Sequence, residues 1–456
     1  MLETFNSNKW ISLILLCIPS LLILGLHFSH LSLPHFWDEA WVYAPAIKKM
    51  STIVPSILPD SIPVELSRGH PLLFQFLGGW WNKIFGMSNA SNHLFALILS
   101  SLTLVLFQKV VAVITNYFIA FCIALLVVIQ PAFFTQSFML YPELLLSLGL
   151  WIALMGYQRE SSFIFLVGAF VLAFSKESSI VFLLAFFIWD AVRYIFFKGT
   201  GRRLLASFLG LTLFSLPFLL NWFFIGWFFY PEHTSLIELD FGRSKYLLQE
   251  IYLYLFEDHG RNWILYGALF LSFVAIAISN RWKLLLITPF VLIAHLVFWE
   301  YKVLPLNQYM IVLAGLLFLP LLVLIVTQHK TSLSKRVDFI ALAYLNVVGF
   351  LFFSAINFFT WRYLSPLLLI LFGSVAVIIY YVLKDRKMLV VIFFVISSYP
   401  LIEYFRHDRI VREVNMGLYA DLEVQQKLIS WLDENIKGEG MCANFVTSNY
   451  LFNPYA

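Results

Sequence analysis

Long apolar runs, separated by short polar connections, recur along almost the whole chain. A helix needs about 20 apolar residues to cross the hydrocarbon core of a membrane. The alternation of apolar and polar positions that marks a membrane β-barrel does not occur, so helices must satisfy the backbone in lipid. The pattern predicts about thirteen spans, with centres near Leu21, Leu104, Ala124, Leu150, Gly168, Leu184, Leu213, Leu271, Phe290, Leu316, Leu345, Leu371 and Phe394.

The composition agrees with this pattern. Apolar side chains make up 61% of the 456 residues, charged side chains only 12%, and the mean hydropathy is +0.84. A soluble domain is far less apolar, so we expect an all-α polytopic membrane protein. The first run, residues 10–33, lacks a small-residue cleavage site and is expected to remain as an uncleaved span. The three cysteines, Cys17, Cys122 and Cys442, predict no disulfide framework.

The distribution of charge predicts the orientation, because basic connections stay in the cytoplasm. Short basic segments occur at 193–203, 281–283, 330–336 and 384–387. An N-terminus inside places 15 of the 30 basic residues, but only 5 of the 26 acidic ones, on the cytoplasmic side. The inner side is then strongly positive and the outer side negative. With thirteen spans, Asp38 and the tail after residue 401 both lie outside.

Three outer segments are long enough to build a site. Residues 34–90 form a first extracytoplasmic loop that is rich in aromatic residues, and we expect helices that lie in the membrane interface. Residues 230–262 form a second outer loop. The expected domains are a transmembrane domain over 1–402 and a short extracytoplasmic C-terminal segment over 403–456, with helical periodicity in "ADLEVQQKLISWLDENIKG".

An adjacent pair of acids, Asp38 and Glu39, follows the first span in "LPHFWDEAWVYAPA". One interpretation is a solvated helix start, because acids favour helix N-termini. The other is catalysis, since a carboxylate at an apolar interface can act as a general base. Further outer residues could contact a phosphate or a sugar: Arg68, His70, Glu143, Lys176, Glu177, Arg362 and Tyr363. Alone, each also fits a solvated charge, and Lys176 with Glu177 fits a mutually neutralising pair.

Several motifs in the right order resemble the GT-C superfamily of membrane glycosyltransferases, in particular its protein O-mannosyltransferase and lipid A aminoarabinose transferase branch. They are "DEAWVY", "GHPLL", "FGMSNASNHLFALILSSL", "QPAFFTQSFMLYPELLLSLGLWIAL", "GAFVLAFSKESSIVFLL" and "WRYLSPLLL". The resemblance covers about residues 10–200 and resumes near 360. Glu143 stands where the family usually has Asp.

The resemblance implies a GT-C-like fold and an inverting transfer of a sugar from a polyprenyl-phosphate donor to an acceptor hydroxyl at the outer face. Asp38 would be the catalytic base, with Glu39 assisting. Lys176, Arg362 and His70 would neutralise the phosphate of the leaving group. Three positions depart from the family pattern and concern the donor head group: Trp41 replaces Arg, Leu72 the second Pro, and His93 an Arg.

Other functions stay open from the sequence. A transporter or flippase of lipid-linked sugars would place its ionisable residues near the middle of the membrane. A polymerase or ligase would be expected to carry a large outer loop rich in Arg, and a non-catalytic scaffold would keep the fold without the chemistry. The predicted partners are the lipid-linked donor, a lipid, glycan or protein acceptor, and the membrane, with no nucleic acid.

Cofactor use is equally open from the sequence, and the expected location is the bacterial inner (plasma) membrane, with the active site facing the periplasm. No cofactor is implied with certainty, although a divalent cation is compatible with the fold. The spacing of candidate ligands matches no defined zinc or calcium site, so no metal ligand is assigned. The acidic and histidine side chains that could converge are His70, Glu39, Glu143, Glu232, His233, Asp258 and His259.

Overall fold

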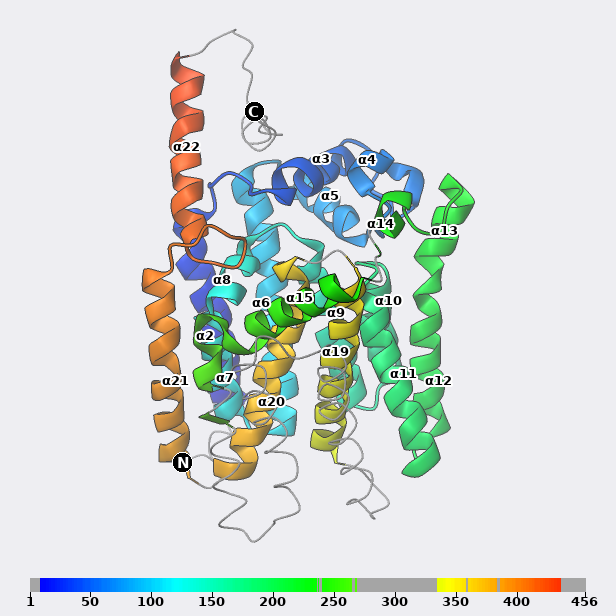
Figure 1. Ribbon diagram of the computed structural model, residues 1–456, viewed down its shortest axis with the longest axis vertical. Coiled ribbons are helices and arrows are strands. Elements are labelled where there is room, and N and C mark those ends of the chain that lie inside the picture. The colour runs from blue at the N-terminus through cyan, green and yellow to red at the C-terminus, as the bar shows by residue number, and fades with distance from the viewer. Residues whose placement is uncertain are drawn as a thin grey trace.

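A computed structural model describes residues 9–235, 237, 240–264, 267–268, 334–357, 360–383 and 386–435. It is helical, with 82% of residues in helices and no strand in the part described. The predicted all-α class is confirmed. Figure 1 shows most long helices running side by side, with shorter helices lying across one end of the bundle.

Seven described helical segments are long and apolar enough to cross a membrane, and a bent pair would make eight. The described helices are therefore compatible with the predicted polytopic membrane protein. The number thirteen and the GT-C topology stay predictions, because the centres near Leu271, Phe290 and Leu316 fall outside the described residues. The other predicted centres lie in α2 (Lys9–His27), α6 (Asn89–Ile114), α7 (Tyr117–Val128), α9 (Pro142–Gln158), α10 (Ser162–Ala173), α11 (Ser179–Phe196), α12 (Gly201–Leu213), α19 (Lys335–Ile356), α20 (Ser365–Leu383) and α21 (Lys387–His407).

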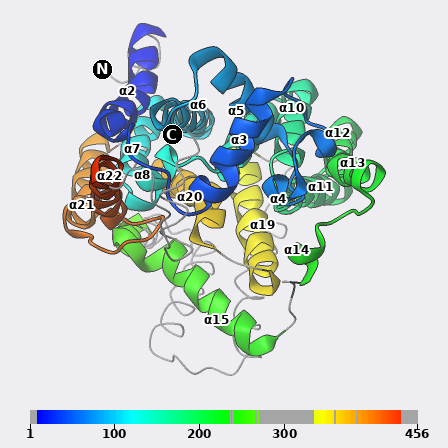
Figure 2. The same cartoon turned by 90° about the horizontal axis from the view of Figure 1, so that it is seen from above.

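The first predicted outer loop folds into short helices across one end of the bundle (Figures 1 and 2). They follow η1 (Phe28–His30), which ends the first candidate span. The helices of the loop are η2 (Glu39–Tyr43), α3 (Ala44–Thr52), η3 (Pro59–Ser61), α4 (Val64–Ser67) and α5 (Leu73–Phe85). Helix α5 is amphipathic: Phe74 and Gly78 are buried, whereas Ile84 and Phe85 are exposed. Its buried face packs on α3, where Gly78 meets Ile47. The expectation of helices in this loop is confirmed.

The third predicted span is bent. Helix α7 and α8 (Pro131–Phe138) meet at 74°. Pro131 stands in the first turn of α8, where a missing N–H costs nothing, whereas inside a continuous helix it would break a hydrogen bond. Every residue of α8 is buried. The bend places the short segment between α8 and α9 at the same end of the bundle as the first outer loop (Figure 1).

The remaining described helices include further long helices of the bundle and several short ones near the first outer loop. Helix α12 continues into α13 (Ser215–Ile225), followed by α14 (Pro231–Ser235). Helix α15 (Phe241–Tyr252) crosses the edge of the bundle beside α19, where Ser244 Oγ donates to the carbonyl of Ala355 at 2.9 Å (Figure 2). It leads into η4 (Leu253–Glu257) and η5 (Asp258–Gly260). After η7 (Trp361–Leu364), α20 and α21, the predicted tail helix is present as α22 (Gly417–Asn435).

Small residues let α9 and α10 approach closely. A Cβ at Gly168 would lie 2.3 Å from the backbone nitrogen of Ala153, and one at Gly156 would lie 2.3 Å from that of Phe165. Apolar burial adds little between helices in lipid, so close backbone packing of this kind is a main source of helix association.

Gly168→Ala should lower the stability of the folded protein. The added methyl group meets backbone atoms that cannot rotate away, and overpacking of this kind costs about 1–3 kcal/mol. The measurement is the melting temperature of the purified protein in detergent. Gly25→Ala, in α2, is the matched control, because its Cβ would meet nothing within 4 Å. Equal melting temperatures for the two variants would contradict this packing.

Candidate functional site

Arg362, in η7, is the centre of a buried cluster of charged side chains. It is 3% exposed and contacts three carboxylates. Its Nη2 pairs with Asp38, its Nε lies 3.3 Å from Glu143 Oε1, and its Nη1 lies 3.2 Å from Glu413 Oε2. The three acids come from the start of η2, the first turn of α9, and the connection between α21 and α22. One guanidinium therefore joins four segments that are distant in the sequence.

Lys176 supplies a second cation to the same cluster. Its Nζ lies 2.5 Å from Glu143 Oε1 and 3.6 Å from the centre of the Tyr363 ring. The guanidinium of Arg362 lies 4.6 Å from the Tyr141 ring. Aromatic faces attract cations, so both positive groups are held by carboxylates and rings together. Sequence-predicted Asp38, Glu143, Lys176, Arg362 and Tyr363 are thus brought together.

Glu413 is an acid of this cluster whose pKa is raised by its surroundings. Burial raises its pKa, although Arg362 acts in the opposite direction. This shift favours the protonated form of Glu413 and so reduces the excess of three carboxylates over the two cations, Arg362 and Lys176. Buried charges need such compensation, because their desolvation is costly. A carboxylate can be exchanged here for another anion without leaving an excess of positive charge.

Glu39, next to Asp38 in the sequence, has a different environment. It is fully buried, and its two carboxyl oxygens accept the backbone N–H groups of Leu140 (2.5 Å) and Phe36 (2.9 Å). Burial raises the pKa of Glu39 to about 8, against the effect of these hydrogen bonds. The interpretation of the pair as a solvated helix start is therefore wrong for Glu39. Its contacts fix the loop that carries Asp38 onto the α8–α9 connection.

A second group of predicted residues lies beside the first. His70 Nδ1 lies 2.8 Å from Glu177 Oε1, and the rings of His70 and His233 are 4.8 Å apart. Arg68 is placed with them only loosely: it lies 5.0 Å from the centre of the Trp41 ring and 3.9 Å from Glu232. No contact joins Arg68 to the carboxylates around Arg362 among the interactions described for it.

Lys176 and Glu177 do not neutralise each other, contrary to one sequence-based interpretation. Lys176 pairs with Glu143, and Glu177 pairs with His70. The turn between α10 and α11 directs consecutive side chains to different neighbours. This turn therefore connects the Arg362 cluster to the His70 group.

Two residues of the site, Glu413 and Tyr141, were not identified from the sequence. Glu413 lies in a polar segment without periodicity, and only the tertiary structure shows that Arg362 contacts it through both its guanidinium and its backbone N–H. Gln136 Nε2 also donates to the carbonyl of Glu413 at 2.6 Å. Tyr141 had a usable signal, since it stands two residues before Glu143 in a predicted outer turn. The C-terminal segment is thus part of the site.

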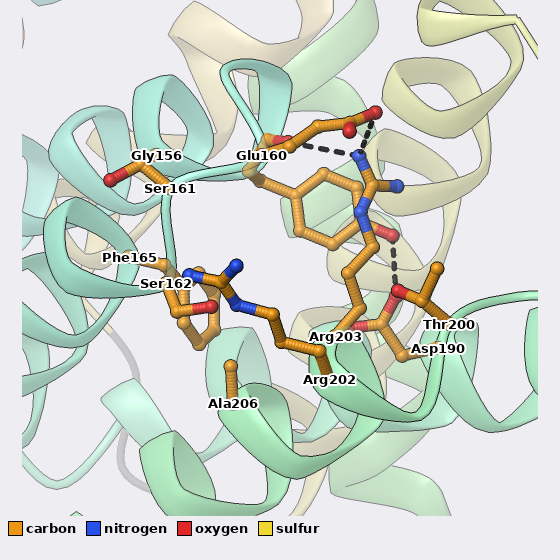
Figure 3. A pocket seen from close by; sticks show the side chains of 11 residues that line it. Gly156, Glu160, Ser161, Ser162, Phe165, Asp190, Thr200, Arg202, Arg203 and Ala206 are labelled. Atoms are coloured by element: carbon orange, nitrogen blue, oxygen red, sulfur yellow. Dashed lines mark hydrogen bonds and ion pairs between the residues drawn. The ribbon is translucent and has the colours of Figure 1, made fainter.

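A cavity of about 220 Å³ lies at the other end of α9 (Figure 3). Its polar side chains are largely paired with each other. Tyr157 donates to Asp190 at 2.6 Å, and Arg203 lies 3.0 Å from Glu160. This end carries the basic segment 193–203, which the charge distribution predicts to be cytoplasmic. Because Glu143 stands in the first turn of α9 and the cavity is lined by Gly156 and Tyr157 near its last turn, the cavity is separate from the Arg362 cluster.

Comparisons with protein-family models, with curated proteins and with solved structures give no match. The resemblance to GT-C enzymes thus remains a prediction from the motifs. The geometry of the site itself indicates its chemistry. The Asp38 carboxylate, at a predicted outer surface, is held by Arg362, a cation that a phosphate could also bind.

Arg362→Gln should destabilise the folded protein by about 3–5 kcal/mol, because it leaves buried carboxylates without their cation. The melting temperature in detergent measures this. Arg409→Gln is the control, since Arg409 is exposed in the segment that also carries Glu413. If the two variants melt together, Arg362 does not have the structural role described.

Glu39→Gln should flatten the pH dependence of stability. Folded Glu39 keeps its proton up to about pH 8, whereas the unfolded chain releases it near the ordinary value of 4.5. The free energy of unfolding should therefore fall as pH rises between these values, by up to about 1.4 kcal/mol per pH unit. The glutamine variant lacks this contribution.

The measurement is the melting temperature from pH 5 to pH 8, with the slope of the variant subtracted from that of the wild type. The exposed Glu434, changed to Gln, provides a control slope that should equal the wild type. A Glu39→Gln slope that also equals the wild type would rule out a buried proton on Glu39.

Proposed function

We propose that the protein is a glycosyltransferase that moves a sugar from a polyprenyl-phosphate donor to an acceptor hydroxyl at the extracytoplasmic membrane face. One observation carries the proposal: Asp38 pairs with Arg362 in a cluster that also holds Lys176. A base and two phosphate-binding cations are the groups that this reaction needs. The order of motifs that resembles GT-C enzymes supports the same conclusion.

The donor phosphate takes the place of a carboxylate on the cations in this proposal. A phosphate binds a guanidinium more favourably than a single carboxylate oxygen does, because planar two-point contact is available. Arg362 then releases Asp38, whose carboxylate is free to accept a proton. Lys176 lies on the same side of Glu143 as Arg362, since both contact the same oxygen, Oε1.

The transfer step is a single displacement. The acceptor oxygen forms a bond to the anomeric carbon while the bond from that carbon to the phosphate oxygen breaks. The proton of the acceptor hydroxyl goes to Asp38, and polyprenyl phosphate leaves with one additional negative charge. Arg362 and Lys176 stabilise this developing charge, which is where electrostatic catalysis is most effective. Attack from the face opposite the phosphate inverts the anomeric configuration.

The position of the cluster favours an enzyme over a transporter. Glu143 stands in the first turn of α9, Lys176 in a turn between helices, and Arg362 in the short helix that precedes α20. Ionisable groups of transporters usually occur near the middle of membrane helices. We propose the bacterial inner membrane as the location, with the cluster facing the periplasm. The acceptor is a hydroxyl of a lipid, a glycan or a protein.

Asp38→Asn should reduce transfer by about 10²–10⁴-fold, because an amide cannot accept the hydroxyl proton. The assay supplies a panel of polyprenyl-phosphate sugars to membranes that contain the variant and analyses the products by mass spectrometry. Asp60→Asn, at an exposed position in the same outer loop, is the control and should keep wild-type activity.

The melting temperature of Asp38→Asn distinguishes lost catalysis from lost folding. A variant that folds, inserts and transfers sugar at the wild-type rate would exclude Asp38 as the base. A wild type that transfers no sugar from any donor in the panel, although it is folded, would count against the proposed reaction.

A further inference from the structure

Three side chains outside the Arg362 cluster form a group with the composition of a metal site. His70, Glu177 and His233 each offer one ligand atom, and these atoms all lie within 4.8 Å of one another. The side chains of His70 and Glu177 are only 12% and 23% exposed. Two imidazole nitrogens and a carboxylate oxygen are a common ligand set for zinc and related divalent metals, with water as the fourth ligand.

The backbone is arranged to bring these residues together. Gly69 has φ +69°, which favours glycine, and a Cβ there would lie 2.6 Å from Tyr230 Cβ. Its missing side chain lets the segment that carries His233 approach the one that carries His70. Asn221 Nδ2 donates to the carbonyl of Gly69 at 3.2 Å and fixes α13 against the same point.

The charges around the group suit a divalent ion. Glu177 supplies the one carboxylate of the set, 2.8 Å from His70 Nδ1. Burial lowers the pKa of the His233 ring to about 4, in the direction of the neutral form that binds metal. The nearby positive charge of Arg68 is opposed by Glu232, 3.9 Å away.

Only small side-chain movements are needed to bind an ion. Ligands of a tetrahedral zinc ion, each about 2.0–2.3 Å from the metal, lie roughly 3.3–3.7 Å from one another. His70 Nδ1 and Glu177 Oε1 are now 2.8 Å apart, and no two ligand atoms of the group are more than 4.8 Å apart. Side-chain rotations that move the ligand atoms by about 1 Å would bring all three to the spacing of zinc ligands.

We propose that His70, Glu177 and His233 bind one divalent transition metal ion of the zinc class. The ion joins the first outer loop, the α10–α11 turn and α14, three segments that are far apart in the sequence. Because Glu177 follows Lys176 directly, the ion also fixes the turn that presents Lys176 to the Arg362 cluster. The metal holds the structure of the site and takes no part in bond making.

The test uses the full-length protein, purified in detergent with a removable tag that contains no histidine, stripped with a chelator and dialysed. Zn²⁺ content is measured by elemental mass spectrometry, and Co²⁺ is titrated while its visible absorption is recorded. Wild type should bind about one equivalent and show the intense bands of low-symmetry Co²⁺. His233→Ala should bind at least about 10-fold more weakly, and so should His70→Ala.

His407→Ala is the matched control, because His407 is 72% exposed and pairs only loosely with Glu403, at 3.5 Å. It should bind metal like wild type. Melting temperatures without metal show that each variant is folded, and added Zn²⁺ should raise the melting temperature of wild type but not that of His233→Ala.

The proposal is overturned if folded wild type binds less than about 0.1 equivalent of Zn²⁺ and Co²⁺, or if His233→Ala retains wild-type affinity. These readouts do not depend on sugar transfer. A protein that binds metal but transfers no sugar, or the reverse, therefore separates this site from the proposed function.

Discussion

The ion pairs of Arg362 are the interaction on which the outer end of the molecule depends. A buried guanidinium is costly unless every face is paired, and here Asp38, Glu143 and Glu413 supply the pairing. Each acid belongs to a different segment, so the charge requirement of one side chain fixes the first outer loop, the start of α9 and the C-terminal segment together. Lys176 adds a second positive charge through Glu143.

The same ion pairs connect the fold of this end of the molecule with the chemistry proposed for the site. A buried salt bridge is weak evidence of stability alone, since apolar residues of the same size often replace it without loss. A buried cluster of carboxylates and cations at the ends of helices therefore indicates another use. Exchange of a carboxylate for a phosphate is such a use, because Arg362 and Lys176 both lie on carboxylates that a phosphate could replace.

The sequence predicted the helical class, the helices of the outer loop and the tail helix, because hydrophobic runs and periodicity are local signals. It also predicted that Asp38, Glu143, Lys176 and Arg362 lie on the same side of the membrane. The four form one cluster, and the side that it faces stays a prediction. The sequence could not predict that Asp38 and Glu39 have different environments, because Asp38 precedes the short π-helix whose first residue is Glu39, and the two side chains contact different segments. That distinction depends on the backbone of Leu140, about a hundred residues away.

The same limit applies to Glu413 and to the turn at Lys176. The segment between α21 and α22 has no pattern of its own, so its contact with Arg362 arises only from the packing of the last two helices against the site. Lys176 and Glu177 looked like a local pair because they are adjacent, whereas each finds a partner more than 30 residues away. Long-range partners of this kind carry no signal in a single sequence.

The central claim is that the cluster binds the phosphate of a lipid-linked sugar, and direct binding tests it most clearly. The measurement is the change in melting temperature when a short-chain polyprenyl phosphate is added to purified protein, compared between wild type and Lys176→Gln, with Lys83→Gln, at an exposed position, as the control. The account predicts a clear rise for wild type and for Lys83→Gln and a much smaller one for Lys176→Gln. An equal rise in all three proteins, or none in folded wild type, would contradict it.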